Sequence, residues 1–572
     1  MTQALIDNLP LIAAAPDGIK ALRGLILDLA VRGKLVPQDP QDEPASELLK
    51  RIAAEKVRLV GLGKAGRQKA SRAISASSPD AALPQTWQWS QLAEVGFISP
   101  RNDGDDDQLA SFVPMSLIAA EHGVPNGHEV RPWGEIKQGY THFAEGDVGL
   151  AKITPCFENG KSTVFRNLTG GFGSGTTELH IVRPVIIEPD YILLFLKSPS
   201  FVAAGVPKMT GTAGQKRIPS DYFAYSPFPL PPLAEQRRIV AKVDELMALC
   251  DRLQAQQADA EAVHATLVKT LLDTLTQSQD ADDFATNWHR LSQHFPTIFT
   301  TEASVDALKQ ALLRMAVRGK LVLQDPRDEP ASELLKRIET EKQRLIGAGI
   351  LKRNPSRQTQ SFAQTNVPQS WSVVCIGDVI GSIDSGWSPA CLTEPSPSED
   401  IWGVLKTTAV QPLRYIESEN KHLPSSLSPR PEYEVKAGDI LITRAGPKNR
   451  VGVSCLVLQT RPRLMISDKI IRIHVVGDSI DARFVCLSMN VGITAEFLEA
   501  SKSGMAESQM NISQEKLRVA PLAVPPLAEQ QRIVAKVDEL LALCDTLKAQ
   551  ITESRTVQRL LAVALIDQTL AA

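Results

Sequence analysis

The sequence predicts an α+β protein that is written as an internal repeat, with two globular domains and two long helices of coiled-coil type. Three observations support this prediction. The two halves of the chain begin and end with nearly identical blocks. The middle of each half contains β-branched runs interrupted by Gly and Pro. Each middle is followed by a long segment without Gly or Pro, in which apolar residues alternate at spacings of four and three.

The two halves are nearly identical in sequence at their ends and differ in their middle parts. Residues 30–52 recur at 316–338, an offset of 286, with 21 of 23 positions identical. Residues 231–253 recur at 525–547, an offset of 294, with 20 of 23 positions identical. If the two copies had diverged uniformly after duplication, sequence identity would have fallen equally in every part. The ends and the middles of the halves are therefore expected to serve different purposes.

The repeat also divides the chain into segments. We expect an N-terminal helical region with a linker, a first globular domain, a central long helix with a helical spacer and linker, a second globular domain, and a C-terminal long helix. The boundaries of these segments, in chain order, are 1–83, 84–230, 231–366, 367–524 and 525–572.

The helices are predicted from apolar periodicity and from the residues at their ends. Residues 233–276 contain no Gly or Pro and, at about 1.5 Å per residue, would form a rod. Shorter helical patterns at 18–30 and 305–316 end near Gly33 and Gly319, which are plausible helix stops.

Two further helices are expected to start after Pro44 and Pro330, since proline is tolerated in a first helical turn. The segments 61–82 and 347–366 are rich in small and polar residues and are interpreted as linkers. Strands are predicted at the β-branched runs 180–187, 439–443 and 470–476.

Composition excludes several classes of protein. The 572 residues include 62 basic and 65 acidic side chains, a net charge of −3, which argues against a polycation that binds nucleic acid everywhere. The seven cysteines are scattered without a CxxC pair, which favours a reducing compartment over a disulfide framework or a zinc site. No signal peptide or membrane span is recognisable, so we expect a cytoplasmic protein with no membrane partner.

Catalytic motifs are not expected in this chain. The GKS at 160–162 lacks the glycine that a phosphate loop needs five residues earlier, where Pro155 stands. Glu135 and Lys137, with Asp107 upstream, loosely resemble a nuclease centre, but the second half has no such trio. No histidine–cysteine cluster or nucleophile elbow is present, so we expect neither a catalytic residue nor a metal site.

Two polar loops recur in both halves, and they contain the candidate DNA-binding residues. Lys and Arg can contact phosphates or guanine edges, and Gln and Asn can pair with adenine. The first half offers Lys152, Thr154, Lys161, Lys208, Thr210, Thr212, Gln215, Lys216 and Arg217. The second half offers Arg444, Lys448, Asn449, Arg450, Gln509 and Asn511.

Charge is the main objection to DNA binding. Segment 84–230 has 11 basic and 15 acidic residues, and segment 367–524 has 16 and 17. A surface for nucleic acid would then be a local patch. The alternative is a coiled-coil scaffold whose globular domains bind protein instead of DNA.

The repeated PPLAEQRRIVAKVDEL (231–246) and PPLAEQQRIVAKVDEL (525–540) resemble a known family. With the two AVRGKLV helix ends, GDVGLAKITPCFENGK (146–161) and a Gln-x-x-Ile element before each long helix, the chain resembles the specificity (S) subunit of type I restriction–modification systems. The likeness extends over essentially the full length.

The resemblance implies two target recognition domains joined by two long antiparallel helices, with each domain reading one half of a bipartite, asymmetric double-stranded DNA site. It implies a non-catalytic subunit that docks two methyltransferase (M) subunits and restriction (R) motor-nuclease subunits. S-adenosylmethionine, ATP and Mg would be bound by these partners, and no cofactor by this chain.

The partner-binding residues expected on the long helices are Ile239, Val243, Leu246, Leu253, Ile533, Val537, Leu540 and Leu547. In one departure from the family pattern, the repeated helix end opens the chain. We therefore expect residues 527–570 to pack beside 18–33, as in a circular permutation.

Overall fold

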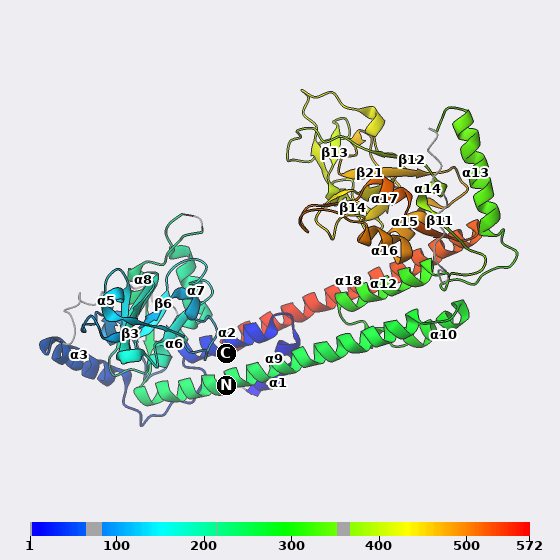
Figure 1. The fold of residues 1–572 in the computed structure, drawn as a ribbon. Helices are drawn as coiled ribbons and strands as arrows, with labels where there is room; N and C mark the ends of the chain where they lie inside the picture. The colour runs from blue at the N-terminus through cyan, green and yellow to red at the C-terminus, as the bar shows by residue number, and fades with distance from the viewer. Residues whose placement is uncertain (1–2, 64–82, 213, 352–366, 572) are drawn as a thin grey trace. The chain divides into compact units, whose positions relative to one another are not determined.

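The computed structural model divides the chain into two compact units, each of which is described by itself. Unit 1 holds residues 1–260 and 553–572, and unit 2 holds residues 261–552. The predicted mixture of helix and sheet is confirmed (Figure 1). The expected linkers lie mostly outside the described residues, which are 3–63, 83–212, 214–351 and 367–571.

Each unit contains the start of one long helix and the end of the other. Helix α9 spans Leu233–Thr276, as the Gly- and Pro-free segment predicts, and α18 spans Leu527–Ala571. Both follow a Pro-Pro pair, whose missing N–H groups are no loss before a first helical turn. Within the described residues, no helix has the length and apolar composition needed to cross a membrane.

The globular domain of unit 1 is built on two antiparallel or mixed sheets. One sheet has the strand order β2-β9-β6-β7 and the other β4-β3-β8-β5, in which β3 and β8 are parallel. The strands are β2 (Gly96–Ile98), β3 (Leu109–Val113), β4 (Glu129–Pro132), β5 (Thr141–Ala144), β6 (Val148–Ala151), β7 (Ser162–Val164), β8 (Phe172–Gly175) and β9 (Leu179–Pro184). A separate antiparallel pair, β1 (Gln88–Ser90) with β10 (Phe228–Leu230), joins the first and last strands of the domain.

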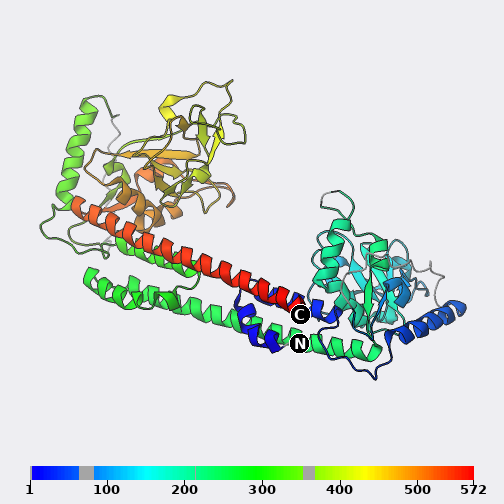
Figure 2. The same ribbon diagram turned by 180° about the vertical axis from the view of Figure 1, so that it is seen from behind.

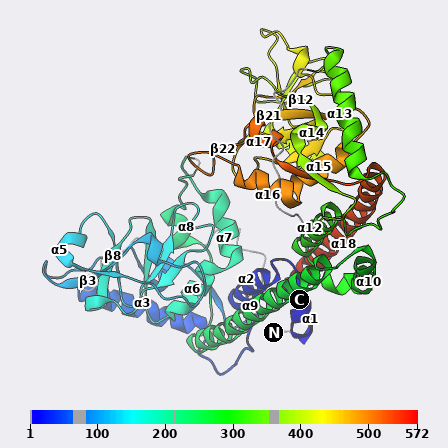
Figure 3. The ribbon, with the colours of Figure 1, turned by 45° about the vertical axis from the view of Figure 1, so that its right-hand side comes forward.

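Short helices complete unit 1. They are α1 (Gln3–Ala14), α2 (Gly18–Val31), α3 (Ala45–Gly61), α4 (Leu92–Val95), α5 (Trp133–Ile136), α6 (Pro189–Lys197), α7 (Pro199–Gly205) and α8 (Ser220–Tyr225), with 3₁₀ turns at Met115–Leu117, Thr169–Gly171 and Val206–Lys208. Helix α2 lies alongside α9 (Figure 3), and Arg23 forms a 2.6 Å ion pair with Asp251.

The end of α18 joins the same core, beside α2 (Figure 2). Lys34 donates a hydrogen bond of 2.9 Å to the carbonyl of Leu570, and Ala562 is buried in the cluster that contains Leu22 and Ile26. The predicted packing of the C-terminal helix beside residues 18–33 is therefore confirmed for the last part of that helix.

Unit 2 repeats this plan with different details. Its main sheet has the order β12-β21-β17-β19, which matches β2-β9-β6-β7 of unit 1, and β11 pairs with β23 as β1 pairs with β10. The strands are β11 (Ser372–Cys375), β12 (Ile380–Ser385), β13 (Gly403–Leu405), β14 (Val410–Gln411), β15 (Arg414–Tyr415), β16 (Asn420–His422), β17 (Ile440–Thr443), β18 (Ala445–Gly446), β19 (Ser454–Leu456), β20 (Leu464–Met465), β21 (Ile470–Val475), β22 (Met510–Asn511) and β23 (Pro521–Val524).

The helices of unit 2 also include elements that the periodicity analysis did not single out, at α10 and α11. They are α10 (Ala281–Ser292), α11 (Phe295–Ile298), α12 (Glu302–Val317), α13 (Ala331–Gly347), α14 (Ile376–Val379), α15 (Ala482–Asn490), α16 (Gly492–Ala500) and α17 (Gln514–Arg518), with 3₁₀ turns at Thr407–Ala409 and Pro431–Tyr433. Helix α12 lies along α18 (Figure 1), where Lys309 pairs with Asp545 and Lys548 with Asp306.

Both predicted helix stops are confirmed. Gly33 and Gly319 follow α2 and α12 with φ of +70° and +71°, the left-handed conformation that glycine tolerates best. Space is also restricted at these positions, since a Cβ on Gly319 would lie 2.4 Å from Cγ of Pro368. The helix therefore ends in a tight turn beneath the first segment of the globular domain.

Candidate nucleic-acid interface

The first candidate surface is the first loop pair, residues 152–161 and 208–217, which the structure brings together. Ile153 and Arg217 form an antiparallel bridge. The amide of Thr154 donates to the carbonyl of Lys216 at 2.9 Å, and the amide of Ile218 donates to that of Lys152 at 2.8 Å. Residues that are more than 60 positions apart in the sequence thus pair to form one surface at the end of strand β6.

Most of the predicted DNA-binding side chains of this pair are exposed. The exposed residues are Lys208, Thr210, Thr212, Gln215, Lys216 and Arg217, and Lys152 is half-buried. Arg217 is held by Glu178 through a bidentate contact with a closest distance of 2.7 Å, and this hydrogen bonding lowers the pKa of Glu178. Lys208 lies over the ring of Tyr222, 5.2 Å from its centroid.

Two predicted residues of the first loop pair face the protein. Lys161 donates to the main-chain carbonyl of Met115 at 3.3 Å. The hydroxyl of Thr154 is buried. These two side chains are therefore less accessible than the exposed residues at 210–212 and 214–217.

The second loop pair, residues 443–452 and 502–516, has the same construction. Strands β18 and β22 pair Ala445 with Asn511, and the amide of Ile512 donates to the carbonyl of Arg444 at 2.9 Å. Lys448 makes two contacts with Glu507. Its main-chain amide donates to the Glu507 carbonyl at 2.7 Å, and its Nζ forms an ion pair with the Glu507 carboxylate at 2.9 Å.

The predicted side chains of the second loop pair differ in accessibility. Lys448, Asn449, Gln509 and Asn511 are exposed, and Arg444 is half-buried. The guanidinium of Arg450 donates to Gln411 Oε1 at 2.8 Å and to the carbonyls of Thr407 and Val410 at 2.9 and 3.0 Å. Arg450 therefore fastens this loop to the 3₁₀ turn before β14.

One position that sequence reasoning missed distinguishes the two surfaces. In unit 1 the amide of Lys152 donates to the carbonyl of Glu178 at 2.9 Å. At the equivalent place in unit 2, the amide of Arg444 donates to the carbonyl of Lys469 at 2.7 Å. An acidic residue thus borders the first loop pair where an exposed lysine borders the second. The two surfaces share a backbone plan and differ in charge and in the side chains that they present.

The predicted partner-binding seam requires a correction. Ile239, Val243 and Leu246 are buried against α2 and its neighbours in unit 1, and Ile533, Val537 and Leu540 are buried in the corresponding cluster of unit 2. Leu253 and Leu547 pack against the same clusters and are partly buried. A heptad pattern shows that a helix face is buried without showing what covers it. Here the chain's own helices cover the six buried side chains, which are therefore not available to a partner subunit, whereas Leu253 and Leu547 stay partly accessible.

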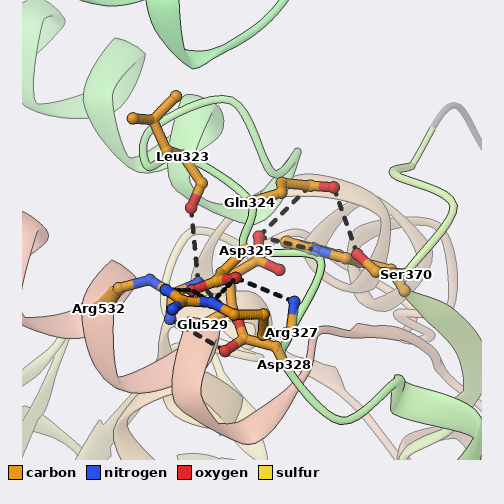
Figure 4. A network of polar contacts seen from close by, with 9 residues as sticks. Leu323, Gln324, Asp325, Arg327, Asp328, Ser370, Glu529 and Arg532 are labelled. Atoms are coloured by element: carbon orange, nitrogen blue, oxygen red, sulfur yellow. Dashed lines mark hydrogen bonds and ion pairs between the residues drawn. The ribbon is translucent and has the colours of Figure 1, made fainter.

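The repeated blocks contact one another within each unit. In unit 2, Arg532 of one block pairs with Asp328 of the other at 2.6 Å (Figure 4). In unit 1 the equivalent residues, Arg238 and Asp42, pair at the same distance. The two repeated blocks of each half therefore contact one another in the same way in both units.

The Glu-Gln of each repeated PPLAEQ sequence lies at the centre of these contacts. The Gln530 amide group donates to the carbonyl of Pro525 and accepts from the amide of Asp481, both at 2.9 Å. Gln236 makes the same two contacts, with Pro231 and Glu188, at 2.9 and 3.0 Å. Each glutamine thus fixes the start of a long helix against the globular domain of its own unit.

Glu529 is buried beside this contact, with 1% of its surface exposed. Its Oε1 accepts from the indole N–H of Trp371 at 3.0 Å and from Gln324 at 3.4 Å, and Gln324 in turn accepts from Ser370 (Figure 4). Burial raises the pKa of Glu529 to about 7, although the Trp371 hydrogen bond and the charge of Arg532 oppose the shift. Burial also raises the pKa of the equivalent Glu235.

One of the residues that loosely resemble a nuclease centre is held in an ion pair. Lys137 pairs with Asp106 at 2.5 Å. Among the residues that the structure describes, no group of three or more His, Cys, Asp or Glu side chains is placed to hold a metal ion.

Comparison with known proteins establishes the family. The chain is 56% identical to the type I restriction enzyme EcoEI specificity subunit of Escherichia coli, over 97% of this chain and 94% of that protein. The chain belongs to the type I restriction enzyme specificity subunits. The EcoAI specificity subunit of Escherichia coli is 41% identical, over 96% of this chain and 93% of that protein.

Other comparisons add less to this family assignment. No protein-family model matches the chain. A solved structure that concerns complex assembly and conformational transition of the type I R-M system covers 86% of this specificity subunit and 98% of its own chain, at 18% identity and a TM-score of 0.47. A likeness of that size carries no argument, and the family rests on the sequence relatives.

Proposed function

We propose that this chain is the DNA sequence-recognition subunit of a type I restriction–modification complex. Each loop pair would read one half of a bipartite, asymmetric double-stranded site, and the long helices would set the spacing between the half-sites as antiparallel rods. The observation that carries the proposal is the pair of equivalent surfaces, which present different exposed side chains on one backbone plan. Such a pair suits two related readers with two different targets.

The division of labour within the complex follows from the same proposal. This chain would be non-catalytic, and methyltransferase and motor-nuclease subunits would bind S-adenosylmethionine, ATP and Mg. Because the domains have slightly more acidic than basic residues, much of the phosphate contact would come from the partners. This chain would contribute mainly the choice of sequence.

The experiment is a paired substitution in the assembled complex. Gln215 and Gln509 occupy equivalent exposed positions, so Gln215→Ala and Gln509→Ala serve as controls for each other. After mapping of methylated adenines has defined the site, each variant should lose about 10- to 100-fold in affinity for its own half-site, as expected when a bidentate base contact is removed. Equal relaxation at both half-sites, or binding without sequence preference or salt dependence, would refute the proposal and favour the scaffold.

Docking of two methyltransferase subunits requires surfaces other than the buried seam. Val263 and Leu267 in the unit 2 part of α9 are exposed, and Val557 and Leu561 occupy the equivalent exposed positions in the unit 1 part of α18. The residues between them differ, whereas these two pairs are identical. Exposed apolar pairs repeated in this way suit two copies of one partner.

Aspartate substitutions test these docking positions. The double variant Val263→Asp/Leu267→Asp should lose one of the two methyltransferase copies, and so should Val557→Asp/Leu561→Asp, as measured by the mass of the purified complex. Leu458→Asp, at an exposed apolar residue without a repeated counterpart, is the control and should leave both copies bound. Retention of both copies by both double variants would place docking elsewhere.

A further inference from the structure

A rigid hairpin projects from the second loop pair. Ser503 and Asn511 exchange two backbone hydrogen bonds of 3.0 and 2.8 Å, and the amide of Gln509 donates to the carbonyl of Ala506 at 2.9 Å across the tip. The strands approach so closely that a Cβ on Gly504 would lie 2.3 Å from the carbonyl oxygen of Gln509. In Figure 3 the segment that contains β22 projects from the body of its domain.

The hairpin is braced from its base. The Nζ of Lys502 donates to the carbonyl of Lys448 at 2.7 Å, and the amide of Lys448 donates to the carbonyl of Glu507 at 2.7 Å. Strand pairing of β22 with β18 adds a third connection. Two contacts of Lys448 and the pairing of β22 with β18 therefore tie this hairpin to the loop at 443–452.

Met505 stands at the tip of this hairpin with a relative exposure of 103%. Among the large apolar side chains of the described residues, it is the most exposed. An isolated exposed apolar residue needs no explanation on a flat surface. At the end of a braced hairpin, a long unbranched side chain with no intramolecular cover has the form of a wedge.

The surroundings of Met505 match a DNA groove. The carboxylate of Glu507, the acidic residue of the tip, is paired with Lys448 at 2.9 Å. Gln509 and Asn511 on the same hairpin are exposed amides that can reach base edges, and Lys469 at its base is an exposed cation that can reach a phosphate. An apolar tip between amides and cations is the arrangement by which proteins insert Met, Leu or Phe side chains between base pairs.

We propose that Met505 inserts between two base pairs of the half-site read by the second domain, so that it unstacks that step and bends the duplex there. The inference rests on the proposed function, since it requires this loop pair to lie in a DNA groove. The first loop pair offers no equivalent wedge among its described tip residues, because Thr212, Gly214 and Gln215 are small or polar. The deformation is therefore confined to one half-site, and DNA shape contributes to specificity on that side alone.

The test uses the complete complex with duplexes that carry 2-aminopurine, whose fluorescence rises when it is unstacked, at successive positions of both half-sites. The wild-type complex should raise the fluorescence several-fold at one step of the second half-site, in addition to any signal from an adenine flipped for methylation. Met505→Ala should abolish the signal at that step, reduce the bend measured by energy transfer between the duplex ends, and weaken specific binding by about tenfold. Signal from the flipped adenine should persist.

Two further variants separate the wedge from other effects. Met505→Leu keeps an apolar side chain of similar reach and should retain the signal. Leu458→Ala, at an exposed apolar residue outside both loop pairs, should change neither half-site. Because Met505 is fully exposed, its replacement removes no packing, and an unchanged circular dichroism spectrum verifies the fold. If Met505→Ala leaves fluorescence and bend unchanged while the wild-type complex binds its sequence specifically, the wedge is refuted and the proposed function stands. If the wild-type complex has no sequence preference, both fail.

Discussion

Replacement of Glu529 by glutamine should make the stability of the protein less sensitive to pH. Glu529 is buried against Trp371 and Gln324, and its pKa is raised from the ordinary value of 4.5 to about 7. The folded chain therefore holds this proton more tightly than the unfolded chain. Between about pH 4.5 and pH 7 the stability contributed by the protonated carboxyl is progressively lost as pH rises.

The magnitude follows from the difference between the two pKa values. Since one pKa unit corresponds to about 1.4 kcal/mol, the ionised Glu529 at pH 8 lowers the free energy of unfolding by on the order of 3 kcal/mol relative to its protonated form. Glutamine keeps an oxygen that can accept the Trp371 hydrogen bond and does not ionise. The Glu529→Gln variant should therefore gain up to this amount over wild type on going from pH 5 to pH 8.

The assay is urea unfolding of wild type and variant at pH 5 and pH 8, followed by tryptophan fluorescence. Trp371→Phe provides a variant with the opposite effect: it removes a hydrogen bond that favours the carboxylate, so the pKa of Glu529 should rise further and the loss of stability should extend to higher pH. Glu235→Gln, at the equivalent buried position of unit 1, should change stability in the same direction as Glu529→Gln. A difference between wild type and Glu529→Gln that is the same at both pH values would refute the reasoning.

Three more substitutions test the packing of the repeated blocks by thermal or urea unfolding. Gly319→Ala should cost about 1–3 kcal/mol because φ is +71° and the new Cβ would meet Pro368, whereas Gly347→Ala in α13, with open space around it, should be neutral or slightly stabilising; equal effects would contradict the turn geometry. Leu540→Ala should cost about 2–4 kcal/mol as a buried truncation and the more exposed Leu543→Ala much less, so similar losses would argue against the buried seam. Arg532→Ala should cost about 1 kcal/mol by removing the partly exposed ion pair with Asp328, and Arg238→Ala the same in unit 1, with no loss in either variant as the contrary result.

Local signals were sufficient to predict much of the secondary structure. The Gly- and Pro-free segment gave the bounds of α9, and the β-branched runs correspond to β9, β17 and β21. Gly33 and Gly319 marked helix ends because the left-handed conformation is a local property of the backbone. The two polar loops of each half were recognised by their recurrence, but that recurrence did not predict that they pair with each other.

Apart from the packing of the C-terminal helix beside residues 18–33, contacts between distant segments were not predicted. The hydrogen bond between Trp371 and Glu529 joins residues 158 positions apart, and no periodicity in either segment signals it. The seam residues were misassigned to a partner because burial of a helix face is encoded locally, whereas the identity of the covering helix depends on tertiary structure. Glu178 and Lys469 were missed for the same reason, since only sheet pairing brings them beside the loops.

The pairing of first and last strands has a consequence for how such chains change over evolutionary time. In each globular domain the first strand pairs with the last, β1 with β10 and β11 with β23, and the last strand directly precedes a long helix. The segment between the two paired strands can therefore become longer or change in sequence without displacing these strands or the long helix that follows them. The second domain illustrates this freedom, because it has an additional strand pair, β14 with β15, while its main sheet keeps the order found in the first. The segment between the paired strands can thus change while these strands and the long helix that follows them keep their positions.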